Sequence, residues 1–161
     1  ILIEYSDFQC PACASIYPSL KNLISKYGEN MRIVYRNFPL PQHDKSDLAA
    51  RAGESAALQG KFWEMHDKLF DGQSLWTIKS EAETTELFGE YAEQIGIDKA
   101  KFLAGLNSPS IAAAIARDIA SGEKSGVNGT PSLFLNDKQL ANLASYGDLE
   151  TYVSRAIDEA R

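Results

Sequence analysis

The pattern of hydrophobic and polar residues at the start of this 161-residue chain predicts a strand, a helix and a second strand. Residues 1–8 are mostly apolar and β-prone and contain no glycine, which is typical of a buried strand. Apolar residues then recur at helical spacing until Gly28 supplies a stop signal, and residues 31–38 form a second β-prone run that Pro39 closes. The chain therefore opens with a βαβ pattern.

A long helical stretch follows the second strand. Residues 44–107 carry apolar positions at helical spacing throughout, with no convincing strand pattern between them. Residues 110–124 continue as a further helix, which ends at a segment rich in glycine. Neither side of the stretch shows a linker or a low-complexity tract. We therefore interpret it as an insertion into one fold and not as a separate tethered domain.

The end of the chain predicts a β-hairpin and a final helix. Residues 132–135 and 139–141 are short β-prone runs joined by a polar turn. From Leu149 onward, apolar residues form an amphipathic stripe, and Asp148 stands before it as the expected N-cap. The order of elements is βαβ, helices, ββα, which places the chain in the α/β class.

Composition and charge are those of an ordinary globular protein, with 44% hydrophobic and 24% charged residues and a formal net charge of -6. Binding to nucleic acid needs clustered Lys and Arg, so we expect no nucleic-acid partner. No apolar run approaches the roughly 20 residues of a membrane-spanning helix. Because the chain lacks a starting Met and opens inside an apolar run, we expect the natural product to be longer at its N-terminus.

Both cysteines of the chain lie in the motif Cys10-Pro11-Ala12-Cys13. The loop that they close is too short to stabilise a fold by restricting the unfolded chain. A strand that runs into this motif, and a helix that starts from it, place Cys10 at a helix N-terminus, which stabilises a thiolate. We therefore expect Cys10 to be an exposed nucleophile and Cys13 to resolve the mixed disulfide that Cys10 forms. Pro11 suits the first helical turn, because the N–H that it lacks would be unpaired there.

The alternative interpretation of this motif is half of a zinc site. Such a site normally recruits a second cysteine pair or a histidine pair, and the sequence offers neither at metal-ligand spacing. His66 falls on an apolar helical face and is expected in the core, and His43 is expected in a loop. We therefore predict no metal ion and no other cofactor.

Two further positions bear on the cysteine chemistry. Glu4 interrupts the apolar first strand. An inward carboxyl would have a raised pKa and would hold or relay a proton near Cys13, whereas an outward one would be an ordinary exposed residue, and the sequence leaves both open. If the Thr130-Pro131 bond is cis, the Thr130 backbone is free of the sheet and can pair with an extended substrate beside Cys10.

Together, these segments resemble the DsbA-like thioredoxin-fold oxidoreductases, bacterial enzymes that introduce disulfides into exported proteins. The resemblance covers nearly the whole chain and is carried by residues 5–13 (YSDFQCPAC), 36–40 (RNFPL), 60–67 (GKFWEMHD) and 126–131 (GVNGTP). It implies a catalytic CxxC motif, a cis-proline at Pro131 and a buried acid at Glu4. Ala12 departs from the pattern, because the best-known oxidases have a histidine there that helps to stabilise the thiolate.

The resemblance also implies the fold and its division. The fold is a thioredoxin fold, βαβ then ββα, with an inserted helical domain. Residues 1–43 and 108–161 would form the thioredoxin-like domain, and residues 44–107 the inserted one.

Three functions follow from these patterns. In the first, the disulfide between Cys10 and Cys13 oxidises cysteine-containing exported proteins, and a membrane-bound or soluble thiol redox partner restores it. The second is a disulfide reductase or isomerase that uses the same site. The third is a non-enzymatic module that binds peptides at the Pro131 edge. Because enzymes that form disulfides work outside the reducing cytosol, the first implies an extracytoplasmic location, in the bacterial periplasm or at the exterior of the cell envelope.

Overall fold

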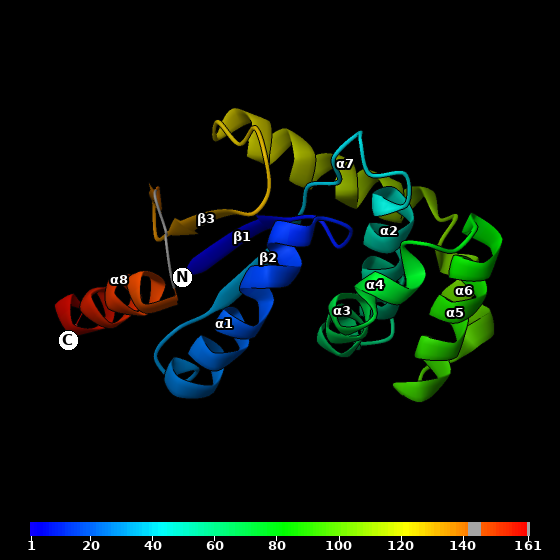
Figure 1. Ribbon diagram of the computed structural model, residues 1–161, viewed down its shortest axis with the longest axis horizontal. Coiled ribbons are helices and arrows are strands. Elements are labelled where there is room, and N and C mark those ends of the chain that lie inside the picture. The colour runs from blue at the N-terminus through cyan, green and yellow to red at the C-terminus, as the bar shows by residue number, and fades with distance from the viewer. Residues whose placement is uncertain (142–145, 161) are drawn as a thin grey trace.

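A computed structural model describes residues 1–141 and 146–160, which fold around a four-stranded mixed sheet (Figure 1). The strands are β1 (Leu2–Ser6), β2 (Ile33–Asn37), β3 (Ser132–Leu135) and β4 (Lys138–Gln139), in the order β2-β1-β3-β4. Strand β1 runs parallel to β2 and antiparallel to β3. The predicted α/β class and the predicted order of elements along the chain are confirmed, although β1 and β2 are shorter than the apolar runs that predicted them. Strand β4 covers Lys138–Gln139 and not residues 139–141 as predicted. It starts one residue earlier because Asn136 takes a positive φ of 54° that tightens the turn, and it ends two residues earlier.

Alternate side chains of β1 face two different helical layers. Leu2 packs with apolar residues of α1 (Pro11–Tyr27) and α8 (Tyr146–Glu159) on one face of the sheet. Tyr5 packs with Phe38 and Val127 on the other face, where α7 (Pro109–Lys124) lies against β2. Because side chains two residues apart share a face, Glu4 and Ser6 point to the same side as Leu2. The strand therefore turns two polar side chains toward α1.

Every element between β2 and α7 is a helix, as predicted, and these helices gather at the end of the molecule opposite α8 (Figure 1). They are α2 (Ser46–Ala57), α3 (Phe62–Asp71), α4 (Gln73–Trp76), α5 (Glu81–Gln94) and α6 (Lys99–Gly105). Their buried core includes Trp76, Phe88 and Phe102, and it continues into Phe8 and both cysteines. The helices thus form one wall around the CxxC motif. The domain limits at residues 43/44 and 107/108 stay a prediction.

The ends of the helices test the predicted caps. Gly28 occupies the C-cap of α1 as predicted. The predicted N-cap of the last helix is wrong, because α8 begins at Tyr146 and Asp148 lies inside its first turn. A carboxylate in the first turn still interacts favourably with the helix dipole, which explains why the sequence signal resembled a cap.

Candidate active site

Strand β1 leads the chain to Cys10, and α1 starts directly after it. Cys10 is the N-cap residue of α1, with an extended backbone (φ -71°, ψ 122°), and Pro11 is the first helical residue as predicted. The unpaired amides of the first helical turn therefore lie beside the Cys10 sulfur. The expected exposure is wrong: Cys10 is only 6% exposed, because it packs in the same cluster as Phe8 and lies against Thr130.

The loop at Thr130 and Pro131 lies against this sulfur. In its thiol form Cys10 donates a hydrogen bond to the Thr130 carbonyl oxygen, with 3.5 Å between the sulfur and the oxygen. The Thr130–Pro131 peptide bond is cis. Pairing between β1 and β3 begins only at Ser132, so the backbone of Thr130 lies outside the sheet ladder. The fold therefore joins two motifs that are 120 residues apart in the chain.

The two thiols differ in acidity. The hydrogen bond from the Cys13 side chain is the largest of the contacts that lower the pKa of Cys10 to about 5. Burial opposes this shift in pKa, while the Thr130 side chain and the amides of Cys13 and Ala12 add to it. Cys13 is fully buried, and this burial together with its contact to Cys10 raises the pKa of the Cys13 thiol far above its usual range. At neutral pH the site therefore pairs a Cys10 thiolate with a Cys13 thiol.

Sequence reasoning anticipated the helix amides but missed the Cys13 thiol as the main neighbour of Cys10. The signal was in the spacing, because residues three apart at a helix start lie on the same face.

Glu4 is the inward-pointing acid that the sequence left as one of two alternatives. The residue is 2% exposed, and its Oε1 atom has no hydrogen-bond partner. Burial raises the pKa of the Glu4 carboxyl to about 7, against a smaller lowering by the Ser6 side chain. The carboxyl is therefore divided between its acid and carboxylate forms near neutral pH.

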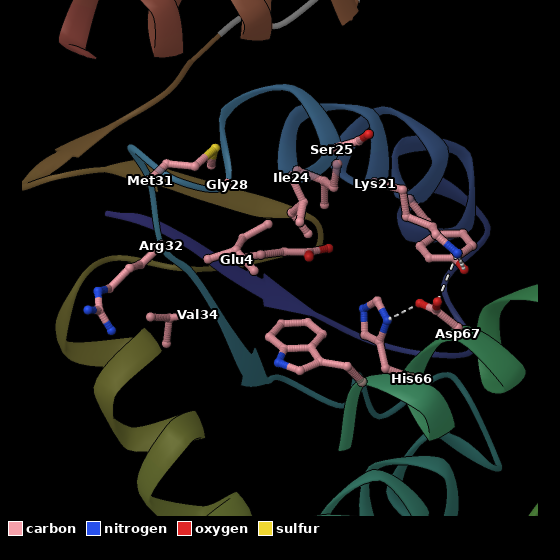
Figure 2. Close-up of a pocket in the computed structure, with 14 residues that line it drawn as sticks. Glu4, Lys21, Ile24, Ser25, Gly28, Met31, Arg32, Val34, His66 and Asp67 are labelled. Carbon is pink, nitrogen blue, oxygen red and sulfur yellow. Dashed lines mark hydrogen bonds and ion pairs between the residues drawn. The ribbon is translucent and has the colours of Figure 1, made fainter. Parts of the chain in front are cut away.

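A cleft of about 640 Å³ opens between α1, the start of β2 and α3, and Glu4 lines it. Figure 2 shows Glu4 extending from β1 into this cleft below Ile24, with Lys21, His66 and Asp67 at its far side. There Asp67 is 2.8 Å from the Lys21 ammonium and 3.1 Å from His66 Nδ1. The buried carboxyl therefore has one side that leads to the cleft.

Both histidines lie where they were predicted. His66 is buried among aromatic rings, including those of Phe8 and Tyr35. His43 lies in a turn, and its Nδ1 atom is 2.7 Å from Oδ2 of the buried Asp7. Sequence reasoning gave Asp7 no role of its own, yet it also accepts a hydrogen bond from the Gln9 amide and so fixes the turn before the CxxC motif. Within the described residues, no group of three or more His, Cys, Asp or Glu side chains has the arrangement of a metal site.

The raised pKa of Glu4 has a consequence for stability. Between about pH 4.5 and pH 7 the folded protein keeps a proton that the unfolded chain has lost, so Glu4 lowers the folding stability as the pH rises through this window. We expect Glu4→Gln to be as stable as the wild type near pH 4 and more stable by roughly 3 kcal/mol at pH 8. Urea unfolding of both proteins at the two pH values measures this difference. An equal gain at both pH values would contradict the assigned cause.

Comparisons with known proteins agree with this fold. The chain belongs to the thioredoxin family, which matches residues 1–155. A thioredoxin-like oxidoreductase from Silicibacter pomeroyi is 29% identical, with a TM-score of 0.76 over 96% of this chain and 84% of that one. Oxidised BdbD from Bacillus subtilis is 24% identical, with a TM-score of 0.82 over 98% and 86%. The thiol-disulfide exchange protein alpha-DsbA2 from Wolbachia pipientis is 21% identical, with a TM-score of 0.80 over 99% and 81%. The predicted thioredoxin fold of the DsbA type is confirmed.

Curated relatives are much longer proteins. A Na(+)/H(+) antiporter NhaA from Herminiimonas arsenicoxydans is 38% identical over 139 residues, which cover 86% of this chain and 21% of the antiporter. NhaA 3 from Salinispora tropica is 35% identical over 161 residues, which cover 99% of this chain and 24% of that protein. The chain thus spans about a fifth to a quarter of these relatives. In the part of the chain that the structure describes, no helix is both long and apolar enough to cross a membrane.

Proposed function

We propose that this chain is a thiol-disulfide oxidoreductase that oxidises dithiols in exported proteins through a redox disulfide between Cys10 and Cys13. The observation that carries the proposal is the Cys10 sulfur, 3.5 Å from the Thr130 carbonyl oxygen and with its pKa lowered to about 5. A thiol this acidic stabilises the reduced protein, so the corresponding disulfide is a strong oxidant.

The catalytic cycle follows from the different burial of the two sulfurs. A substrate thiolate attacks Cys10, because Cys13 is fully buried. The bond between the two cysteines breaks, and Cys13 leaves with the electron pair and takes up a proton. A second substrate thiolate then attacks the substrate sulfur of the mixed disulfide, and Cys10 leaves as a thiolate. Two electrons pass from the substrate dithiol to the disulfide of the protein.

The proposed partners follow from the same site. Thr130 and Pro131 would hold an extended segment of a cysteine-containing protein beside Cys10, because the Thr130 backbone lies outside the ladder. Pro11 would set the start of α1, and thereby the amides near the sulfur. A membrane-bound or soluble thiol redox partner would restore the disulfide, and an extracytoplasmic location would keep it oxidised.

Equilibrium with glutathione tests the direction of the reaction. The protein is incubated in glutathione buffers of defined ratio, and the fraction with a disulfide between Cys10 and Cys13 is measured by mass. We expect a potential nearer to about -120 mV, typical of strong oxidants, than to about -270 mV, typical of thioredoxin. A potential near the lower value would contradict the oxidase and favour the reductase.

A further inference from the structure

Three polar side chains with buried oxygen atoms lie together on the sheet face below Cys13. Glu4 and Ser6 share this face of β1, and Tyr35 of β2 is the register partner of Glu4 in the parallel pair. Each of the three has a buried oxygen without a hydrogen-bond partner: Glu4 Oε1, Ser6 Oγ and the Tyr35 hydroxyl. Buried polar groups are nearly always paired, so three orphaned oxygens side by side need an explanation.

The Ser6 hydroxyl is the common neighbour of this cluster and of the resolving cysteine. Burial raises the pKa of the Glu4 carboxyl, of the Cys13 thiol and of the Tyr35 hydroxyl, and the Ser6 side chain opposes part of each rise. Ser6 also lies on the face of β1 that α1 covers, so it is close to all three groups. A serine hydroxyl has one donor and two acceptor lone pairs, and it rotates to suit its partners. It is therefore suited to accept a proton from one neighbour and to donate its own to another.

The chemistry at Cys13 requires such a transfer. Cys13 is fully buried, and it acts as a nucleophile only after it has lost its proton. Glu4 is a buried base of suitable strength and is also in contact with the cleft between α1, the start of β2 and α3. In this arrangement Cys13 is the proton donor, Ser6 the intermediary and Glu4 the acceptor. The cleft connects the acceptor with solvent.

We propose that Ser6 is a positioning residue that passes protons between Cys13 and Glu4, and that the cleft is where Glu4 exchanges them with solvent. When Cys13 attacks a mixed disulfide at Cys10, its S–H proton moves to Ser6 Oγ and the Ser6 hydroxyl proton moves to the Glu4 carboxylate. The bond between Cys13 and Cys10 forms, and the substrate sulfur leaves as a thiolate with the electron pair. The transfers reverse when Cys13 becomes the leaving group. This inference rests on the proposed function.

Other titratable or charged groups surround Glu4. They are Cys13, Tyr17 and Lys21 of α1, Arg32 and Tyr35 at or before β2, and His66 and Asp67 of α3. His66 is the one whose ordinary pKa also lies near neutrality, and burial moves the pKa of His66 downward. A rate change centred near pH 7 therefore reports Glu4.

The test is a rapid-quench reaction of the reduced protein with excess oxidised glutathione, analysed by mass. The first step forms the mixed disulfide at Cys10, and the second releases glutathione when Cys13 attacks. We expect the second step of the wild type to accelerate as the pH rises through about 7, because the Glu4 carboxylate is the proton acceptor. In Ser6→Ala the second step should slow about tenfold or more at pH 7 and lose this acceleration, while the first step is unchanged.

Four further variants make the result specific. Ser6→Thr keeps a hydroxyl and should restore both the rate and the pH profile. Adding Glu4→Gln to Ser6→Ala should slow the second step no further than Glu4→Gln alone, because both act on one path. Thr84→Val removes a buried hydroxyl of α5, which donates to the Trp76 carbonyl, and should leave both steps unchanged.

Two outcomes overturn the proposal: a second step in Ser6→Ala with the rate and profile of the wild type, or an equal slowing of both steps. A wild type that forms no mixed disulfide with glutathione overturns the proposed function itself, and the inference with it.

Discussion

Cys10→Ser is expected to lower the rate of dithiol oxidation by at least about a thousandfold, because a serine oxygen cannot form or exchange a disulfide. Both electrons from the substrate enter through the Cys10 sulfur, since Cys13 is fully buried and cannot be attacked directly. The rate is measured with a peptide that contains two cysteines, by following the loss of two hydrogen mass units as its disulfide forms.

Ser15→Ala is the matched control for this substitution. Ser15 is an exposed residue of the same helix, and its hydroxyl donates to the Pro11 carbonyl. We expect this variant to retain the rate of the wild type. If the Cys10→Ser variant still fulfilled the whole biological role of the wild type, that role would not depend on redox chemistry. The non-enzymatic peptide-binding module would then be the better interpretation.

Most of the fold could be predicted because its elements carry strong local signals. The apolar run before Cys10, the helical spacing after it and the stop at Gly28 gave the first βαβ unit. The turn before residue 138 was placed within one residue, since a polar pair between two β-prone runs is a strong hairpin signal. The N-cap of α8 was misplaced, because an acidic residue is favoured both at a cap and within the first turn.

The interior of the candidate site could be predicted only in part. Strand periodicity puts Glu4 and Leu2 on the same face, but helices cover both faces of β1, so the sequence has no polar face from which to decide where Glu4 points. The proximity of Ser6 on β1 to Cys13 on α1 depends on how α1 crosses the sheet, which local sequence patterns do not determine. Likewise, Asp7 meets His43 only because the loop after β2 folds back onto the turn that precedes the CxxC motif.

Cys13→Ser is expected to trap substrates as stable mixed disulfides with Cys10, because the resolving thiol that releases them is absent. Nonreducing gels of the variant incubated with disulfide-containing proteins should show adducts that disappear on reduction, because the Cys10 thiolate attacks a substrate disulfide and one substrate sulfur leaves as a thiolate. The double variant Cys10→Ser, Cys13→Ser is the matched control and should form none. Adducts through Cys13 in the Cys10→Ser variant would contradict the assigned roles.

A second substitution at the same position separates trapping from the acidity of Cys10. Cys13→Ala should also trap substrates, but it removes the side-chain donor that contributes most to lowering the pKa of Cys10. The pKa of Cys10 in Cys13→Ala should therefore lie above about 5, whereas the serine variant retains a hydroxyl donor and should shift less. Thiolate absorbance measured against pH in both variants gives the two values. Equal values would mean that the helix amides and Thr130, and not the side chain at position 13, hold Cys10 in its ionised form.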